Sequence, residues 1–330
     1  MKKVIVLLGP TGVGKTGASI LLAKELDTEI ISADSMQIYR GMDIGTAKPT
    51  KKELAEVRHH MIDIIEPTAS YSAGQYINAA TEIIGELHKK NRIPIVVGGT
   101  GLYIKAMTRG IFGGPSADLP LRDELLSREQ SSPGSLHAYL VRMDSEAAEK
   151  IQKNDIRRIV RALEVCLKSR EKISLLQKNL TCALPYAFIK IGLTRERKEL
   201  YRIINERVEK MFEAGLIEEA ETILRKCPDR TAMQAIGYKE LAMYLNKEID
   251  KDEALRLIKR NTRRYAKRQF TWFNKEENIN WIDVTGFLDR EGVFQCVLDT
   301  LVRVFPRLFS CSTAKKIATL HCHNAKRLNN

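Results

Sequence analysis

Near its start the chain reads Gly9-Pro10-Thr11-Gly12-Val13-Gly14-Lys15-Thr16, and this stretch decides the fold. It follows an apolar run at residues 4–8 and precedes a helix-like segment at 18–26. A strand, a glycine-rich turn and a helix in this order are typical of a P-loop, whose backbone N–H groups and helix N-terminus bind phosphate oxygens. Lys15 supplies a positive charge and Thr16 a hydroxyl ligand for Mg²⁺. The alternative is a glycine-rich turn without a ligand, and the flanking strand and helix favour the P-loop.

Further apolar segments predict an α/β fold, a P-loop NTPase-like parallel sheet with flanking helices. We expect strands at residues 29–35, 94–100, 187–193 and 280–284. We expect helices at residues 71–90, from residue 101, and at 200–214, 217–226, 252–272 and 292–305.

Asp34 and Ser35 end the second expected strand. Ligands of open α/β sheets bind at the carboxyl ends of strands, so both residues should lie at the same edge as the P-loop. Motor and switch NTPases end a buried strand with an aspartate that holds Mg²⁺, whereas the strongest such strand here ends in Gly98-Gly99-Thr100. Asp34 therefore has three interpretations: a Mg²⁺ contact, a general base, or a residue that caps its own loop.

The middle of the chain predicts an all-helical insertion. A segment rich in Gly, Pro and Ser at residues 110–120 marks a boundary, and residues 121–177 are almost continuously helical in pattern. We divide the chain into core residues 1–114, an insertion at 115–185, further core at 186–308 and a flexible tail at 309–330. In the segment 154–164, Asp155 is expected near the helix start, and the apolar stripe is Ile156, Ile159, Val160 and Leu163.

Three arginines, Arg157, Arg158 and Arg161, fall off that apolar stripe. They either form a solvated face with ion pairs to neighbours such as Glu164, or they contact phosphate, and the residues alone leave both open.

The charge of the chain indicates a polyanionic partner. The 54 Lys and Arg outnumber the 41 Asp and Glu, which gives a net charge of +13. The densest cluster lies in the segment 252–272, where aromatic residues follow it, and this pattern is typical of nucleic-acid binding. Nearby acids are too few to neutralise the seven charges of that cluster: Arg256, Lys259, Arg260, Arg263, Arg264, Lys267 and Arg268.

The six cysteines show no CxxC spacing, which fits reduced thiols in a cytoplasmic protein. No apolar run approaches the length of a membrane span or a signal peptide, so we expect no membrane partner. Cys311 and the run His321-Cys322-His323 do not match the spacing of structural zinc sites, so we assign no metal there.

These motifs together resemble the bacterial tRNA dimethylallyltransferase family, also called tRNA isopentenyltransferases, over roughly residues 3–285. The resemblance rests on the order of six blocks: the P-loop 9–16, the segment 32–49, Gly98-Gly99-Thr100-Gly101-Leu102-Tyr103, the segment 154–164, Ile236-Gly237-Tyr238-Lys239-Glu240, and the segment 266–273. The chain differs from the family at Ser145, where a proline is usual, and at Ile203, where an arginine is frequent.

The resemblance implies an activity. Such enzymes move the dimethylallyl group of dimethylallyl diphosphate to N6 of the adenosine on the 3′ side of the anticodon in tRNA, with Mg²⁺, and release diphosphate. It implies that residues 9–16 bind the diphosphate, that Asp34 is the general base, and that Lys15 and Arg207 stabilise the leaving group. Thr100 would orient the adenine amine or a donor oxygen.

The resemblance also implies the tRNA contacts, with the insertion binding the anticodon stem of the tRNA. With the basic helix included, the expected contacts are Asp34, Ser35, Met36, Gln37, Thr100, Arg122, Arg157, Arg158, Ile159, Val160, Arg161, Lys267 and Arg268. Nothing in the sequence demands more than a monomer.

Two other functions remain open from the motifs alone. A P-loop kinase acting on a nucleoside or small metabolite would need ATP, which the P-loop motif also permits. A non-catalytic RNA-binding NTPase module would use the P-loop as a switch.

Overall fold

The computed structural model describes residues 1–308, which form two compact units. Unit 1 combines Met1–Ile104 with the chain from Pro185 onward, and unit 2 is Lys105–Leu184. Unit 2 corresponds to the expected insertion at 115–185 but begins ten residues earlier, inside helix α4 (Gly101–Arg109). The expected tail at 309–330, with Cys311 and the His321-Cys322-His323 run, lies outside the described residues.

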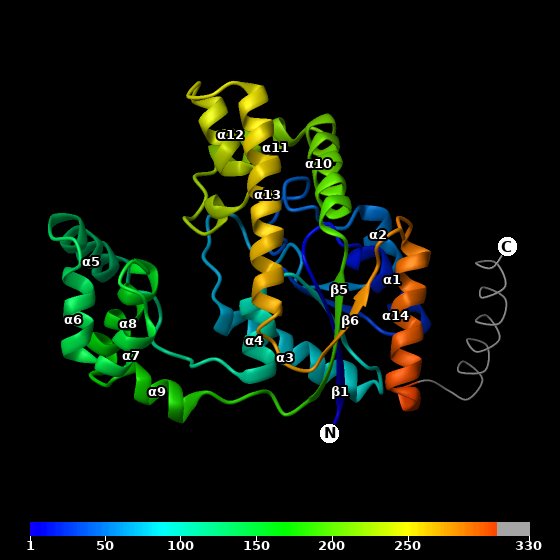
Figure 1. Ribbon diagram of the computed structural model, residues 1–330, viewed down its shortest axis with the longest axis horizontal. Coiled ribbons are helices and arrows are strands. Elements are labelled where there is room, and N and C mark those ends of the chain that lie inside the picture. The colour runs from blue at the N-terminus through cyan, green and yellow to red at the C-terminus, as the bar shows by residue number, and fades with distance from the viewer. Residues whose placement is uncertain (309–330) are drawn as a thin grey trace. The chain divides into compact units, whose positions relative to one another are not determined.

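Unit 1 is built on a six-stranded parallel sheet, which confirms the α/β prediction (Figure 1). The strand order is β3-β2-β4-β1-β5-β6. Five strands fall where the apolar segments place them, and the sixth, β3, was not expected because two residues give no pattern. The strands are β1 (Lys3–Leu8), β2 (Ile30–Ala33), β3 (His59–His60), β4 (Ile95–Gly98), β5 (Ala187–Thr194) and β6 (Ile279–Asp283).

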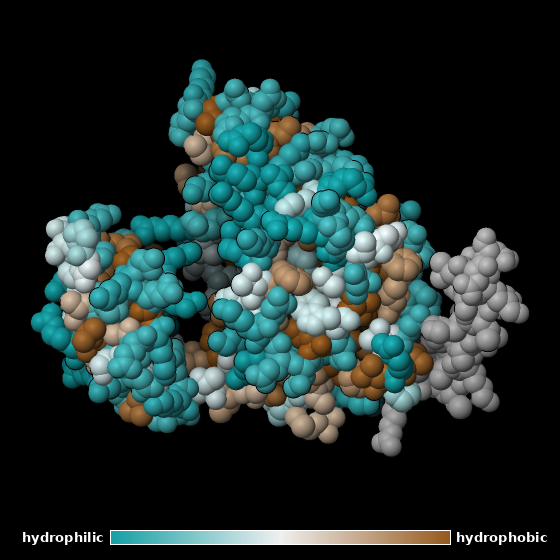
Figure 2. Space-filling model, in the orientation of Figure 1, coloured by the Kyte–Doolittle hydropathy of each residue, from teal (hydrophilic) through white to brown (hydrophobic). Residues whose placement is uncertain are grey.

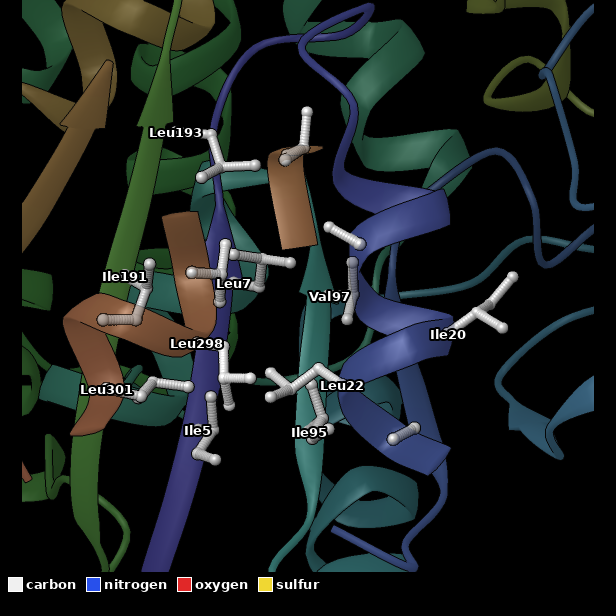
Figure 3. Packing of buried hydrophobic residues seen from close by; sticks show 14 of the residues in the cluster. Ile5, Leu7, Ile20, Leu22, Ile95, Val97, Ile191, Leu193, Leu298 and Leu301 are labelled. Atoms are coloured by element: carbon white, nitrogen blue, oxygen red, sulfur yellow. The ribbon is translucent and has the colours of Figure 1, made fainter. Parts of the chain in front are cut away.

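Helices cover the sheet because parallel strands are apolar on both faces. Odd-numbered side chains of β1, such as Ile5 and Leu7, pack with α1 and α14 in the main core, which also takes in Ile191 and Leu298 (Figure 3). The helices of unit 1 are α1 (Lys15–Glu25), α2 (Lys51–Glu56), α3 (Ala73–Lys89), α10 (Arg197–Glu213), α11 (Leu216–Arg225), α12 (Tyr238–Leu245), α13 (Lys251–Phe273) and α14 (Arg290–Val304).

The register of the sheet brings three strand ends together. Gly98 of β4 is paired with Leu8 on one side and with Ala33 on the other. The P-loop, Asp34 and Gly99-Thr100 therefore leave the sheet at one level. The strands approach so closely at this level that a Cβ on Gly98 would lie 2.2 Å from the carbonyl oxygen of Ala33.

Unit 2 is all helical, as the pattern at 121–177 predicts, with short breaks between the helices. Polar caps divide it into separate helices, with Asp118, Asp144 and Asp155 accepting backbone N–H bonds at three starts. Ser145 is the first residue of α7, a position where serine and proline are both accepted. The helices are α5 (Leu119–Ser131), α6 (Ser135–Met143), α7 (Ser145–Lys150), α8 (Ile156–Ser169) and α9 (Ile173–Leu180).

The close approach at Gly98 should make this position sensitive to substitution. Gly98→Ala should lower the free energy of unfolding by roughly 2 kcal/mol, because the added methyl group clashes with the backbone of Ala33 and only a shift of β2 can relieve the clash. Chemical denaturation followed by circular dichroism measures this. Gly85→Ala is the matched control, since a Cβ there meets nothing within 4 Å in the middle of α3, and it should be neutral or stabilising. Equal unfolding midpoints for the two variants would contradict the role given to Gly98.

Candidate active site

The P-loop closes around its own lysine. Gly12 and Gly14 have φ of 84° and 106°, a region that favours glycine, and they turn the chain from β1 into α1. The Lys15 Nζ donates to the carbonyl oxygens of Gly9 and Pro10 at 2.9 and 2.8 Å. Burial, opposed by Asp34 and aided by neighbouring Arg207, lowers the pKa of Lys15 to about 7. An anion in the loop would favour the charged lysine.

A second cation reaches the loop from α10. The Arg207 Nη1 donates to the Thr11 Oγ1 at 3.1 Å. Two turns of α10 lie over the loop, and a Cβ on Gly12 would sit 3.1 Å from Ile204 and 3.9 Å from Ile203. The chain thus has an apolar residue beside the P-loop at the position where the resembled family often has arginine.

Asp34 caps its loop and also keeps one oxygen open. Its Oδ1 accepts the N–H of Met36 at 2.8 Å and that of Gln37 at 3.3 Å. Within residues 1–308 no hydrogen bond to Oδ2 is present. Burial raises the pKa of Asp34, and the two N–H donors together with Lys15 and Arg207 lower it. The capping interpretation therefore holds, and it leaves a carboxylate oxygen for a further role.

Thr100 lies beside Ser35 at the adjoining strand end. The Thr100 Oγ1 accepts the N–H of Ser35 at 3.0 Å and lies 3.4 Å from the Ser35 Oγ. Tyr265 of α13 lies beside the side chains of both Thr100 and Gln269, and burial raises the pKa of its phenol. Thr100 thus has neighbours from two elements.

The loop after Asp34 is fixed by side chains rather than by a strand. Glu219 of α11 accepts the backbone N–H groups of Asp43, Ile44 and Gly45 at 2.8–2.9 Å. The Gln37 amide also serves the loop, since it donates to the carbonyl of Ala47 at 3.3 Å and accepts the Ser32 hydroxyl at 3.2 Å. Gln37 is therefore committed to the loop in this structure.

Gln269 is a site residue that the sequence pattern did not identify. It is 6% exposed, and its amide joins the P-loop to the end of β4. Its Oε1 accepts the N–H of Thr11 at 2.8 Å, and its Nε2 donates to the carbonyl of Gly99 at 2.9 Å. The available signal was a polar residue on the buried stripe of α13, which otherwise reads Ala254, Ile258, Ala266 and Phe273.

The basic helix α13 has both paired and unpaired charges. Arg256 pairs with Glu253 at 2.6 Å, and Lys259 pairs with Glu209 at 2.5 Å. Lys267 and Arg268 are exposed, and neither has an ion pair within residues 1–308. Hydrophilic residues predominate over the helices α10–α13 on the face in Figure 2.

The arginines of unit 2 that are expected to contact tRNA divide into two pairs. Arg157 and Arg158 are exposed on α8, and Arg158 pairs with Asp155 at 3.3 Å. Arg122 and Arg161 pair instead with the fully buried Glu164, at 2.8 and 2.5 Å.

The prediction for Ile159 and Val160 needs correction. Their side chains are 0% and 5% exposed within the core of unit 2, so they support the helix and present almost no surface to a partner in this structure.

The described chain contains no cluster of three or more His, Cys, Asp or Glu side chains suited to a metal. Thr16, the residue predicted to hold Mg²⁺, begins α1 with Lys15, and its hydroxyl has no hydrogen bond within residues 1–308. A site completed by substrate phosphates needs only one or two protein ligands, so the residues present fit Mg²⁺ in that form. No helix among those described is long and apolar enough to cross a membrane.

Comparison with known proteins gives one consistent family. The model described as IPP transferase matches residues 37–276. The tRNA dimethylallyltransferase of Thermodesulfovibrio yellowstonii is 53% identical over 310 residues, 92% of this chain and 98% of that protein. The tRNA dimethylallyltransferase of Thermotoga neapolitana is 44% identical over 305 residues, 92% of this chain and 99% of that protein.

Solved structures agree. The full-length tRNA isopentenylpyrophosphate transferase from Bacillus halodurans has a TM-score of 0.68 and 40% identity, over 98% of this chain and 100% of that one. A eukaryotic dimethylallyltransferase acting on tRNA has a TM-score of 0.73 and 27% identity, over 92% of this chain and 80% of that one.

The Glu164 cluster generates a prediction about stability. Glu164→Gln should lower the free energy of unfolding by about 2 kcal/mol, because it leaves Arg122 and Arg161 without a buried counter-charge, although both are one-third exposed. The ion pairs and N–H bonds hold the pKa of Glu164 at about 2 despite burial, below its ordinary 4.5. The stabilisation is therefore present above about pH 4.5 and lost as the pH falls toward 2.

Denaturation at pH 7 and pH 3 measures this difference. Glu146→Gln is the control, because Glu146 is partly exposed and solvent screens its pairs with Lys150 and Lys178, so its loss at neutral pH should be much smaller than that of Glu164→Gln. An equal loss in the two variants, or a Glu164→Gln loss that does not shrink at pH 3, would contradict the assignment.

Proposed function

The chain belongs to the IPP transferase family and is an enzyme that transfers a dimethylallyl group to tRNA, and we propose that the transfer takes place at the edge of the sheet formed by the P-loop and Asp34. The donor is dimethylallyl diphosphate, and the acceptor is N6 of the adenosine on the 3′ side of the anticodon. One observation carries this assignment: two cations, Lys15 and Arg207, lie at a phosphate-binding loop, while a carboxylate with an open oxygen shares their electrostatic environment.

The P-loop half binds the departing diphosphate. Breaking the C–O bond of the donor builds negative charge on the bridging oxygen, and charged donors held in place stabilise that charge. Lys15 would exchange its bonds to Gly9 and Pro10 for phosphate oxygens, and Arg207 would reach them from beside Thr11. Backbone N–H groups of residues 9–16 complete the cradle.

Mg²⁺, when bound with the donor, would neutralise diphosphate charge and support the leaving group. On the protein side we assign it to the Thr16 hydroxyl, with the substrate supplying further oxygens.

The carboxylate half accepts the proton. As the allylic carbon bonds to N6, the amine loses a proton, and Asp34 Oδ2 is the atom we assign to receive it. Met36 and Gln37 hold the opposite oxygen, so the carboxylate keeps one orientation. Thr100, fixed beside Ser35, would orient the adenine amine.

The adenine must leave the anticodon stack, which costs a few kcal/mol that contacts elsewhere offset. We assign phosphate contacts to exposed Lys267 and Arg268 on α13 and to exposed Arg157 and Arg158 on α8. The proposed catalytic groups all come from one chain, so a monomer suffices. We place the enzyme in the cytoplasm, where unpaired thiols such as Cys166 stay reduced.

The assay that tests this function also tests Asp34. Incubation with dimethylallyl diphosphate, Mg²⁺ and unmodified tRNA, followed by nucleoside mass analysis, should show a dimethylallyl adenosine from the wild type. Asp34→Asn should lower kcat about 10²- to 10⁴-fold with tRNA affinity within about twofold, because it removes the base and keeps the loop cap. Since burial raises the pKa of Asp34, the acid limb of the wild-type kcat/KM profile should lie above about pH 4.

Asp283→Asn is the matched control for this variant. Asp283 also ends a parallel strand and also accepts an N–H bond from two residues onward, from Thr285 at 2.9 Å. It should leave kcat unchanged. Wild-type transfer by Asp34→Asn would remove the base assignment, and ATP consumption without tRNA modification would overturn the function.

The exposed charges on α13 give a second prediction. Lys267→Ala with Arg268→Ala should weaken tRNA binding roughly tenfold. It should also reduce the slope of log Kd against log salt by the amount expected for the loss of nearly two phosphate contacts. Filter binding at several salt concentrations measures the slope. The control double variant, Arg256→Ala with Lys259→Ala, removes charges already paired with Glu253 and Glu209, and its slope should match the wild type. Identical slopes for both double variants would mean that Lys267 and Arg268 do not face RNA.

A further inference from the structure

Gln269 connects the two halves of the proposed site. The P-loop follows β1 and Thr100 follows β4, and these neighbouring strands are joined by backbone hydrogen bonds only as far as the pair Leu8 and Gly98. The amide of Gln269 joins the segments that follow, with Oε1 on the N–H of Thr11 and Nε2 on the carbonyl of Gly99.

The fit around this amide is tight. A Cβ on Gly99 would lie 2.1 Å from the Gln269 Nε2, so the glycine gives the amide its approach to the backbone. Tyr265, one turn earlier on α13, lies beside both Gln269 and Thr100. The resulting series of neighbouring residues runs from Thr11 through Gln269 and Tyr265 to Thr100.

We propose that Gln269 is a positioning residue for the transfer, whose amide sets the spacing between the diphosphate-binding loop and the strand end that carries Thr100. This inference rests on the function proposed above. Thr11 is the contact point, because Gln269 holds its backbone while Arg207 holds its hydroxyl. Fixing Thr11 therefore fixes both the path of the loop and the guanidinium beside it.

Only a carboxamide satisfies both partners. It presents an acceptor to Thr11 and a donor to Gly99 without a net charge. A carboxylate would keep the bond to Thr11 but set an oxygen against the Gly99 carbonyl. Methionine would keep the volume and leave both backbone groups unpaired, which is costly at a buried position.

The test compares Gln269→Met, Gln269→Glu and Tyr265→Phe with the wild type. Steady-state transfer gives kcat, and equilibrium binding of inorganic pyrophosphate and of tRNA gives two independent affinities. Gln269→Met should lower kcat about 10²-fold, the expected consequence of misplacing reacting groups by an ångström. It should weaken pyrophosphate binding about fivefold, as for the loss of one hydrogen bond, with tRNA affinity within about twofold of the wild type.

The other two variants should have smaller effects than Gln269→Met. Gln269→Glu should retain pyrophosphate affinity better than Gln269→Met, because it preserves the Thr11 bond. Tyr265→Phe, which leaves both backbone bonds of Gln269 in place, should lower kcat less than either. Thr300→Val is the stability control, since it removes a buried hydroxyl that donates to the Cys296 carbonyl on α14 and should not change kcat.

Three results would overturn the inference: a Gln269→Met kcat close to that of the wild type, a kcat loss matched by Thr300→Val, or a loss explained by weaker tRNA binding alone. Failure of the wild type to modify tRNA would instead reject the proposed function. The pyrophosphate measurement distinguishes the two cases, because it needs no transfer.

Discussion

The alignment of three strand ends at Gly98 is the constraint on which the proposed site depends. Hydrogen bonding in register places Leu8, Gly98 and Ala33 side by side. The three segments that follow carry the P-loop, Thr100 and Asp34, so chemistry that is scattered over a hundred residues meets at one edge. The backbones lie too close at Gly98 for any side chain. A slip of one residue in either pairing would separate the groups and reverse the faces of the strand.

In the proposed function, the burial of opposite charges makes this edge of the sheet sensitive to the charge of its substrates. Lys15, Arg207 and Asp34 influence one another, and burial acts against the charged form of each. A bound diphosphate would favour both cations, and loss of a proton from the adenine would be matched by gain of one at Asp34. The charges of the substrates would thus compensate the buried charges of the protein.

Helix α13 has a buried face and an exposed basic face. Its buried stripe ends in Gln269 and Phe273, and Gln269 joins the P-loop to the end of β4, while Lys267 and Arg268 on the same turns remain exposed. In the proposed function one rigid element therefore supports the diphosphate loop and presents charge to RNA. In unit 2 the division is different, because Glu164 takes up Arg122 and Arg161 and leaves Arg157 and Arg158 exposed.

The sequence by itself determined the P-loop, five of the six strands, the helical character of the insertion and the candidate groups Lys15 and Asp34. These follow from local patterns, since apolar periodicity and glycine spacing act over a few residues, whereas Thr100 and Arg207 came from the resemblance to a family. Only the tertiary structure decided which charges are free and that Gln269 holds the P-loop. Each of these depends on partners distant in the chain, such as Gln269 and Thr11, separated by 258 positions. A local sequence pattern cannot predict such a contact, because it forms only through the register of the sheet and the packing of α13.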